Sequence, residues 1–192
     1  EEMHRNRLYI PDAGTAALAE AYLDRMMAEC NSVGGVVECV IDGLPSGIGD
    51  PVFEKYDASL AKAILSIGAV KGFEIGDGFQ AAKSVGSENN DAFRVDESGK
   101  VQKETNHAGG ILGGISDGSR VVLRAAFKPT PSIAQPQRSV TRGLEETELV
   151  IKGRHDPIIV PRAVVVVQSM AALVLIDALM QNMTARVDYL RD

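Results

Sequence analysis

A chain of 192 residues with 45% hydrophobic and 24% charged side chains suits one domain, or a fragment of one, with a substantial core, and it is far from the composition of disordered proteins. A formal net charge of −6 argues against nonspecific nucleic-acid binding, although a few local cations can still hold a small anion. Two cysteines form neither a CxxC pair nor a disulfide framework, which favours a reducing cytoplasm.

The first half of the chain predicts alternating helices and strands. The opening EEMHRNR has no basic-then-apolar leader, so we expect neither secretion nor import. Apolar residues recur at helical spacing over residues 15–30, with Asp12 or Thr15 as the candidate N-cap. The β-branched residues 36–45 predict a strand and its turn, and a second helix is expected over residues 51–67. Residues 69–79 predict a short strand broken by glycines.

The second half begins with a polar, turn-rich segment, residues 86–105, for which a mobile surface loop or a hairpin is expected. Residues 119–128 and 146–153 predict strands. Between these two segments lie three of the eight prolines, which forbid regular helix and favour an extended loop.

Residues 163–180 are almost wholly apolar, but the segment contains Gln168, Ser169 and Asp177 and falls short of the roughly 20 residues that a membrane span needs. We therefore expect no membrane interaction. The pattern favours a helix that is buried on most sides, with Pro161 near its first turn, where a missing N–H costs nothing.

Two stretches could approach a ligand. NHAGGILGGISDG, residues 106–118, has two glycine pairs that let backbone come close either to a ligand or to a neighbouring strand, and it matches neither GxGxxG nor the Walker pattern. In FKPTPSI, residues 127–133, an extended chain would put Lys128, Thr130 and Ser132 on one side, which suits a phosphate. An ordinary solvated loop would have the same composition, so both interpretations stay open.

KGRHDPIIVPR, residues 152–162, concentrates charge directly before the apolar segment. Arg154 offers a fixed fork of donors for a carboxylate or phosphate, and His155 could transfer a proton. Asp156 could act as a base, orient a base or cap the helix. A salt-bridged turn that caps the helix is the alternative. The three histidines have no metal-binding spacing and no GxSxG elbow is present, so neither a metal site nor a serine nucleophile is expected.

Four ordered stretches together resemble chorismate synthase: GLPSGIGDPVFEKYDASLAKAILSIGAVKGFEIGDGF, NHAGGILGGISDG, KPTPSI and GRHDPIIVPRAVVVVQSMAALVLIDALM. The resemblance extends over residues 11–183. It implies an α+β fold, a sandwich of antiparallel sheets packed around central helices, and a homotetramer. It also implies a reduced-FMN-dependent anti 1,4-elimination of phosphate from 5-enolpyruvylshikimate 3-phosphate, which gives chorismate for aromatic amino acid biosynthesis. NADPH is a possible reductant of the flavin.

The resemblance also assigns site residues. Gly68, Ala69, Gly113 and Arg154 fall on FMN-binding positions, as does the run Lys128, Pro129, Thr130, Pro131 and Ser132. Asp156 falls on the functional aspartate of the family, proposed to assist proton removal. At Gly68 the family usually has Asn, and at Pro131 it usually has Ser or Ala, so at Gly68 only a backbone contact is expected.

Some of the family's motifs have no counterpart in this chain. Its two active-site histidines, its arginine-rich substrate contacts and its RSS flavin motif belong to an N-terminal half that this sequence does not match. We therefore expect this chain to correspond to the C-terminal half and to have little or no activity alone. The alternative is a non-catalytic module that binds flavin or phosphate.

Overall fold

The computed structural model describes residues 2–153 and 155–185 and divides into two compact units. Unit 1 comprises residues 1–36 and 127–164, and unit 2 comprises residues 37–126 and 165–192. The boundaries fall inside β1 (Gly35–Ile41), β7 (Val121–Phe127) and α4 (Val160–Thr184). Each unit has its own set of helices and strands.

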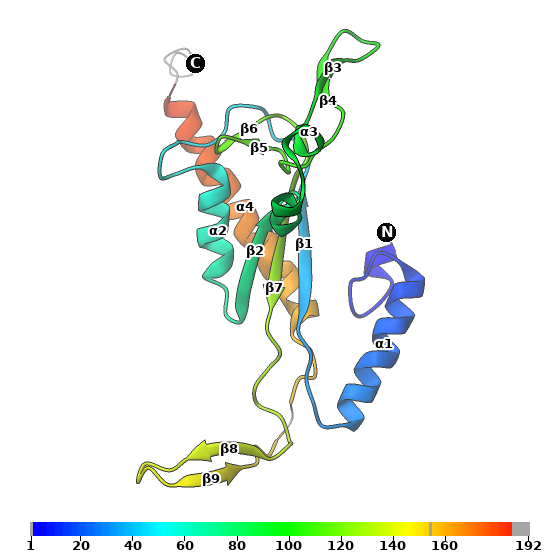
Figure 1. The fold of residues 1–192 in the computed structure, drawn as a ribbon, viewed down its shortest axis with the longest axis vertical. Helices are drawn as coiled ribbons and strands as arrows, with labels where there is room; N and C mark the ends of the chain where they lie inside the picture. The colour runs from blue at the N-terminus through cyan, green and yellow to red at the C-terminus, as the bar shows by residue number, and fades with distance from the viewer. Residues whose placement is uncertain (1, 154, 186–192) are drawn as a thin grey trace. The chain divides into compact units, whose positions relative to one another are not determined.

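Unit 1 contains the short 3-10 helix η1 (Glu2–His4), helix α1 (Ala13–Ala28) and a hairpin of β8 (Gln137–Val140) and β9 (Glu146–Leu149) (Figure 1). The Asp12 carboxylate accepts a hydrogen bond from the Thr15 backbone N–H at 2.6 Å, which confirms the expected N-cap. The hairpin is antiparallel, and β8 forms inside the segment for which only an extended loop was expected. Residues 137–140 contain no proline, so their N–H groups are free to pair.

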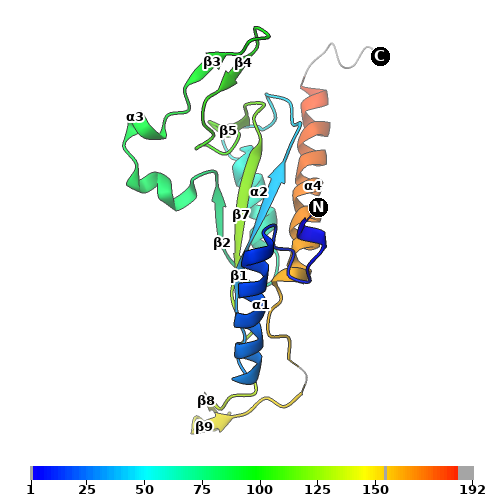
Figure 2. The ribbon, with the colours of Figure 1, turned by 90° about the vertical axis from the view of Figure 1, so that its right-hand side faces the viewer.

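Unit 2 is organised around a three-stranded sheet in the order β1–β7–β2, where β2 spans Val70–Ile75. Every second side chain of β7 is buried, beginning with Val121, Leu123 and Ala125, which are fully enclosed. Such alternation places one face of the strand in the core. Figure 2 shows α4 running alongside this sheet. The strands predicted over residues 36–45, 69–79 and 119–128 are thereby confirmed, with shorter bounds.

Helix α2 (Tyr56–Leu65) buries Tyr56, Leu60 and Ile64 and begins five residues later than expected. The delay has a local cause, because Asp50 and Glu54 exchange backbone hydrogen bonds of 2.9 and 3.1 Å. This closed turn uses the N–H and C=O groups that a longer helix would need.

The rest of unit 2 consists of short elements. The chain forms a 3-10 helix η2 (Gly78–Lys83) and a single turn α3 (Gly86–Asn89). Two antiparallel hairpins follow, β3 (Phe93–Val95) with β4 (Val101–Lys103), and β5 (Ile111–Leu112) with β6 (Ile115–Ser116). For residues 86–105 the hairpin was therefore the correct alternative.

Helix α4 differs from the sequence expectation. Only 17% of its most apolar window is buried inside this chain, so the prediction of a helix buried on most sides is wrong here. Val167 and Ala171 are buried, whereas Leu173, Ile176 and Met180 are exposed. By length and composition alone α4 would be able to cross a membrane. Within this chain it is a helix with one buried face and one exposed apolar face.

The closest backbone approach in unit 2 generates a stability prediction. A Cβ on Gly76 would lie 2.1 Å from the His107 carbonyl oxygen, and the φ of Gly76 is +55°. Gly76→Ala should therefore lower the free energy of unfolding by about 2–4 kcal/mol through strain and overpacking. Gly99→Ala is the matched control, since Gly99 has a φ of +79° but nothing within 4 Å. It should cost only about 1–2 kcal/mol. Urea denaturation followed by circular dichroism measures both, and equal losses would refute the role of the close approach.

Candidate functional site

Residues 31–33 connect the two polar stretches of unit 1. The Ser32 hydroxyl donates a 2.6 Å hydrogen bond to the carbonyl oxygen of Thr130, inside the KPTPS loop. The next residue, Val33, donates its backbone N–H to the Pro157 carbonyl oxygen at 2.8 Å and forms a bridge with Ile158. The loop of residues 128–132 and the turn of residues 155–157 are thus attached to the same short segment. Sequence reasoning missed this segment, because it carries no motif.

A cavity of about 180 Å³ lies at this junction. Residues from three separate parts of unit 1 border it: Met27, Cys30, Asn31, Ser32, Ile133, Ala134, His155 and Pro157. Ile133, at the end of the first predicted stretch, and His155, inside the second, therefore border one space. This is the place where the structure brings sequence-predicted functional segments together.

The KPTPS loop has polar groups to offer a ligand. Lys128 is exposed and forms no ion pair with any described residue. Within the same described residues the hydroxyls of Thr130 and Ser132 make no hydrogen bond, while the Pro131 carbonyl oxygen accepts from Gln137 Nε2 at 2.9 Å. The backbone is thus held while a cation and two hydroxyls stay available. That combination suits a phosphate oxygen.

In the GRHDP stretch, Arg154 lies outside the described residues. His155 Nε2 is 3.1 Å from the Ile151 carbonyl oxygen, a contact that favours a structural role for this histidine. Asp156 forms an ion pair with Arg162 in the first turn of α4. The salt-bridged turn that was the alternative interpretation is therefore present, and it still leaves Asp156 Oδ1 without a hydrogen bond from the described residues.

The flavin positions expected in unit 2 lie at opposite ends of α2. Gly113 forms the turn of the β5–β6 hairpin, and the neighbouring Gly114 carbonyl oxygen accepts the Tyr56 N–H at 2.8 Å, at the start of α2. Gly68 and Ala69 follow the other end of the helix (Figure 1). Because each residue adds about 1.5 Å, the helix separates them by roughly 15 Å. Within unit 2 the structure does not bring these positions together.

Local geometry favours glycine at one of these three positions, Gly113. Gly113 has a φ of +60°, and a Cβ there would meet nothing within 4 Å, so its backbone faces open space. Ala69 also has a positive φ, +71°, although it is not a glycine. At Gly68 a Cβ would meet nothing within 4 Å.

A buried ionic cluster anchors the glycine stretch, and sequence reasoning missed it too. The Lys103 ammonium donates to Asp117 at 2.7 Å and to Asp91 at 3.2 Å, and the side chains of Lys103 and Asp91 are each 3% exposed. Asp91 also accepts from the Thr105 hydroxyl and from the backbone N–H groups of His107 and Ala108. The base of the β3–β4 hairpin is therefore fixed by buried charges, which neither a mobile loop nor a hairpin predicted from the sequence had indicated.

These contacts determine the charge of the two aspartates. Burial alone would raise the pKa of Asp91, but hydrogen bonds from Ala108, Thr105 and His107 outweigh it and hold the pKa well below the ordinary range. Burial would also raise the pKa of Asp117, but hydrogen bonds outweigh burial and lower this pKa, and the strongest of them comes from Lys103. Both carboxylates are ionised at neutral pH.

Comparison with known proteins gives consistent matches. The family model described as chorismate synthase matches residues 1–180. Chorismate synthase of Agathobacter rectalis is 62% identical over 191 residues, 100% of this chain and 52% of the relative. The corresponding protein of Lachnoclostridium phytofermentans is 57% identical over the same shares. A solved structure titled "Crystal Structure of Chorismate Synthase" is 31% identical with a TM-score of 0.78, over 95% of this chain and 47% of the other. The expected α+β fold is confirmed.

The ionic cluster predicts a large effect of one substitution. Lys103→Met leaves two buried carboxylates without their cation, so the free energy of unfolding should fall by about 3–5 kcal/mol. Lys100→Met is the control, because Lys100 is exposed on the same hairpin segment. Urea denaturation at pH 7 measures the two losses. A Lys103→Met chain as stable as the control would show that the cluster contributes little.

The same cluster predicts a pH dependence. A carboxyl whose pKa is lowered on folding stabilises the fold above its unfolded pKa of about 3.9, and the contribution is lost as the pH falls toward the folded pKa. The free energy of unfolding should therefore decrease below about pH 4. Asp91→Asn should flatten this decrease, whereas Glu97→Gln, at an exposed position, should not. Unfolding curves between pH 7 and pH 3 provide the measurement, and parallel curves for both variants would contradict the assignment.

Proposed function

Because the chain belongs to the chorismate synthase family, we propose that it contributes a flavin-binding part of an enzyme that eliminates phosphate from 5-enolpyruvylshikimate 3-phosphate. The reaction is a reduced-FMN-dependent anti 1,4-elimination that breaks a carbon–oxygen bond and gives chorismate. The chain spans about half the length of the curated relatives it matches. We therefore propose for this chain a contribution to the activity and not the whole activity.

The observation that supports this proposal best is the junction in unit 1. Residues 31–33 hold both the KPTPS loop and the turn that carries His155 and Asp156, and a cavity of about 180 Å³ beside them is lined by Ser32, by Ile133 and Ala134 just after the loop, and by His155 and Pro157 of the turn. The end of the loop segment and the turn, more than twenty residues apart in sequence, thus border one space. A turn with only a structural role would not explain why these two segments meet next to polar groups that make no hydrogen bond with the described residues.

The donor set of the loop fits the anionic end of a flavin or the phosphate of the substrate. Lys128 supplies a charge, and Thr130 and Ser132 supply hydroxyls that no described residue uses. Reduced FMN, when bound, would supply electron density that helps the phosphate to leave. The side chains of this chain orient the anion and balance its charge.

Asp156 is the proposed proton acceptor. Its Oδ2 forms a partly exposed ion pair with Arg162 that orients the carboxylate, and its Oδ1 has no partner among the described residues. A base needs such an accessible oxygen within hydrogen-bond reach of the proton that it removes. Arg162 therefore acts as a positioning residue for Asp156.

The exposed face of α4 indicates that the active enzyme needs more than this chain. Leu173, Ile176, Met180 and Met183 are all exposed and follow a 3-4 spacing, which places them on one stripe of the helix. In a fold whose sheets pack around central helices, such a stripe is covered by further protein. We therefore expect the chain alone to turn over little or no substrate.

The binding half of the proposal is tested by titrating FMN into the chain and following flavin fluorescence, with and without 5-enolpyruvylshikimate 3-phosphate. We expect saturable binding that Lys128→Met or Arg154→Ala weakens about tenfold or more, since a charge-assisted hydrogen bond contributes about 1.5–3 kcal/mol. Arg142→Ala is the control, because Arg142 is exposed beyond the loop. Equal affinity in all variants, or no saturable binding by a folded chain, would contradict a flavin site in this half.

A further inference from the structure

Helix α4 has a second apolar face, opposite the one that it buries in unit 2. The buried face includes Val167 and Ala171. Because each residue advances an α-helix by about 100°, the opposite face is formed by six positions with alternating spacings of three and four residues, all of them exposed. We call this face the α4 seam; its members are Val166, Ser169, Leu173, Ile176, Met180 and Met183. The seam is about 26 Å long.

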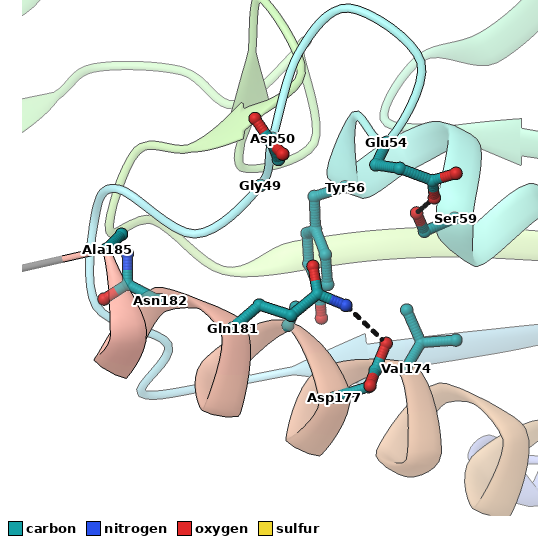
Figure 3. A pocket seen from close by; sticks show the side chains of 11 residues that line it. Gly49, Asp50, Glu54, Tyr56, Ser59, Val174, Asp177, Gln181, Asn182 and Ala185 are labelled. Carbon is teal, nitrogen blue, oxygen red and sulfur yellow. Dashed lines mark hydrogen bonds between the residues drawn. The ribbon is translucent and has the colours of Figure 1, made fainter.

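The spacing of the seam indicates the kind of partner that covers it. Its members are the a and d positions of a heptad, and such side chains pack as knobs into the holes of another helix. A strict a/d stripe is also narrower than the face that a helix presents to a globular core. Asp177 flanks the seam beside a cavity next to α2, and its carboxylate accepts a hydrogen bond from Gln181 Nε2 at 2.8 Å (Figure 3). The seam itself carries no charge, so an apolar helix suits it best.

A lipid bilayer is the other apolar environment that could cover the seam, since α4 is long and apolar enough to span one. Val167 and Ala171, however, are buried against the rest of the chain. A helix that crossed a bilayer would have to leave this core. The net charge of −6 also opposes adsorption on anionic lipid. These observations favour a protein partner that covers only the outer face of α4.

The sizes of the side chains along the seam fit a second copy of α4. Two identical seams can run antiparallel about a two-fold axis that passes between Leu173 and Ile176. Every layer then joins a smaller side chain to one that is as large or larger, so the layers have similar volumes and interdigitate. The layers pair Leu173 with the partner's Ile176, Ser169 with the partner's Met180, and Val166 with the partner's Met183. A parallel pair would instead place Ser169 opposite the partner's Ser169 and leave a gap.

Ser169 is the one polar member of the seam, and its hydroxyl does not oppose burial. The hydroxyl donates a 2.8 Å hydrogen bond to the Val165 carbonyl oxygen of the same helix. A hydroxyl that is already hydrogen-bonded can leave water at little cost. Ser169 therefore provides room for a large side chain of the partner.

We propose that α4 joins two copies of this chain, with the α4 seams pairing antiparallel about a two-fold axis. Such an isologous contact closes with two copies. Burying one large apolar side chain removes about 60–120 Å² from water, so five in each copy would bury on the order of 600–1,200 Å² in total. This area is at the low end for specific interfaces. We therefore expect a weak dimer, with a dissociation constant of about 1–100 μM.

Sedimentation equilibrium of the full chain over about 1–200 μM tests for this dimer. Ile176→Lys places a charge in the middle of the seam and should weaken dimerisation about tenfold or more. Gln168→Lys is the matched control, because Gln168 is exposed on α4 but lies outside the seam. Circular dichroism checks that both variants fold. A monomer at every concentration would overturn the proposal and leave the seam to the half of the relatives that this chain does not match. A dimer that Ile176→Lys does not weaken would overturn it too.

A size exchange tests the antiparallel pairing. Ser169→Met would crowd the layer that holds the partner's Met180, and Met180→Ser would leave a gap there, so each should weaken the dimer about tenfold. The chain with both changes should dimerise within about threefold of the original, because the exchange keeps the volume of the layer. Gln168→Met adds the same side chain outside the seam and should have no effect. A stronger dimer in Ser169→Met, as nonspecific apolar association predicts, or no recovery in the double variant would contradict the pairing.

Flotation with phosphatidylcholine vesicles distinguishes lipid from a second copy. A chain that dimerises in solution and does not float supports the proposal. A chain that stays monomeric and floats with the vesicles overturns it. None of the variants changes a residue assigned to flavin binding or proton transfer, so FMN fluorescence reports independently on the proposed function.

Discussion

The ionised Asp91 carboxylate is the contact on which the arrangement of unit 2 depends. A buried carboxylate is tolerated only when its oxygens are hydrogen-bonded and its charge is balanced. Asp91 meets this requirement with donors from Thr105, His107 and Ala108 and with the ammonium of Lys103. These donors lie within residues 103–108, just before and at the start of the glycine stretch, so satisfying one carboxylate fixes the backbone that leads into the glycine pairs. The close approach of Gly76 to Gly109 then sets where the stretch meets β2.

Periodicity and capping predicted the regular elements because those signals are local. The spacing of apolar residues and the Asp12 carboxylate are sufficient for α1, and β7 alternates between buried and partly exposed positions as a half-buried strand does. The Asp91 cluster is different, since Asp91 and Lys103 stand in a polar, turn-rich segment. Nothing in their order distinguishes a solvated charge from a buried one. Burial here follows from pairing with Asp117, which only the folded chain brings near.

The candidate site in unit 1 was predictable in its parts but not in how they meet. The KPTPS and GRHDP stretches are recognisable in the sequence, and their polar groups suggest an anion on chemical grounds. What joins them is the segment of Ser32 and Val33: the Ser32 hydroxyl donates to a carbonyl oxygen 98 positions further along the chain, and the Val33 N–H donates to the Pro157 carbonyl oxygen. A serine after a helix has no feature that predicts such a partner. The long-range pairing that forms the cavity is therefore set by the tertiary fold.

Helix α4 shows why composition alone misjudged burial. Its inward positions include Val167 and Ala171, small side chains that let a helix approach a sheet closely, while its larger side chains at Leu173, Ile176, Met180 and Met183 face outward. Because nearly every residue of this segment is apolar, the sequence does not show which side chains face the sheet and which face outward. Burying each large side chain contributes about 1.5–3 kcal/mol, so covering four of them is worth about 6–12 kcal/mol. That is comparable with the whole stability of an ordinary domain, about 5–15 kcal/mol. Covering this face would therefore stabilise the fold by an amount comparable with that of the core that α4 shares with the sheet.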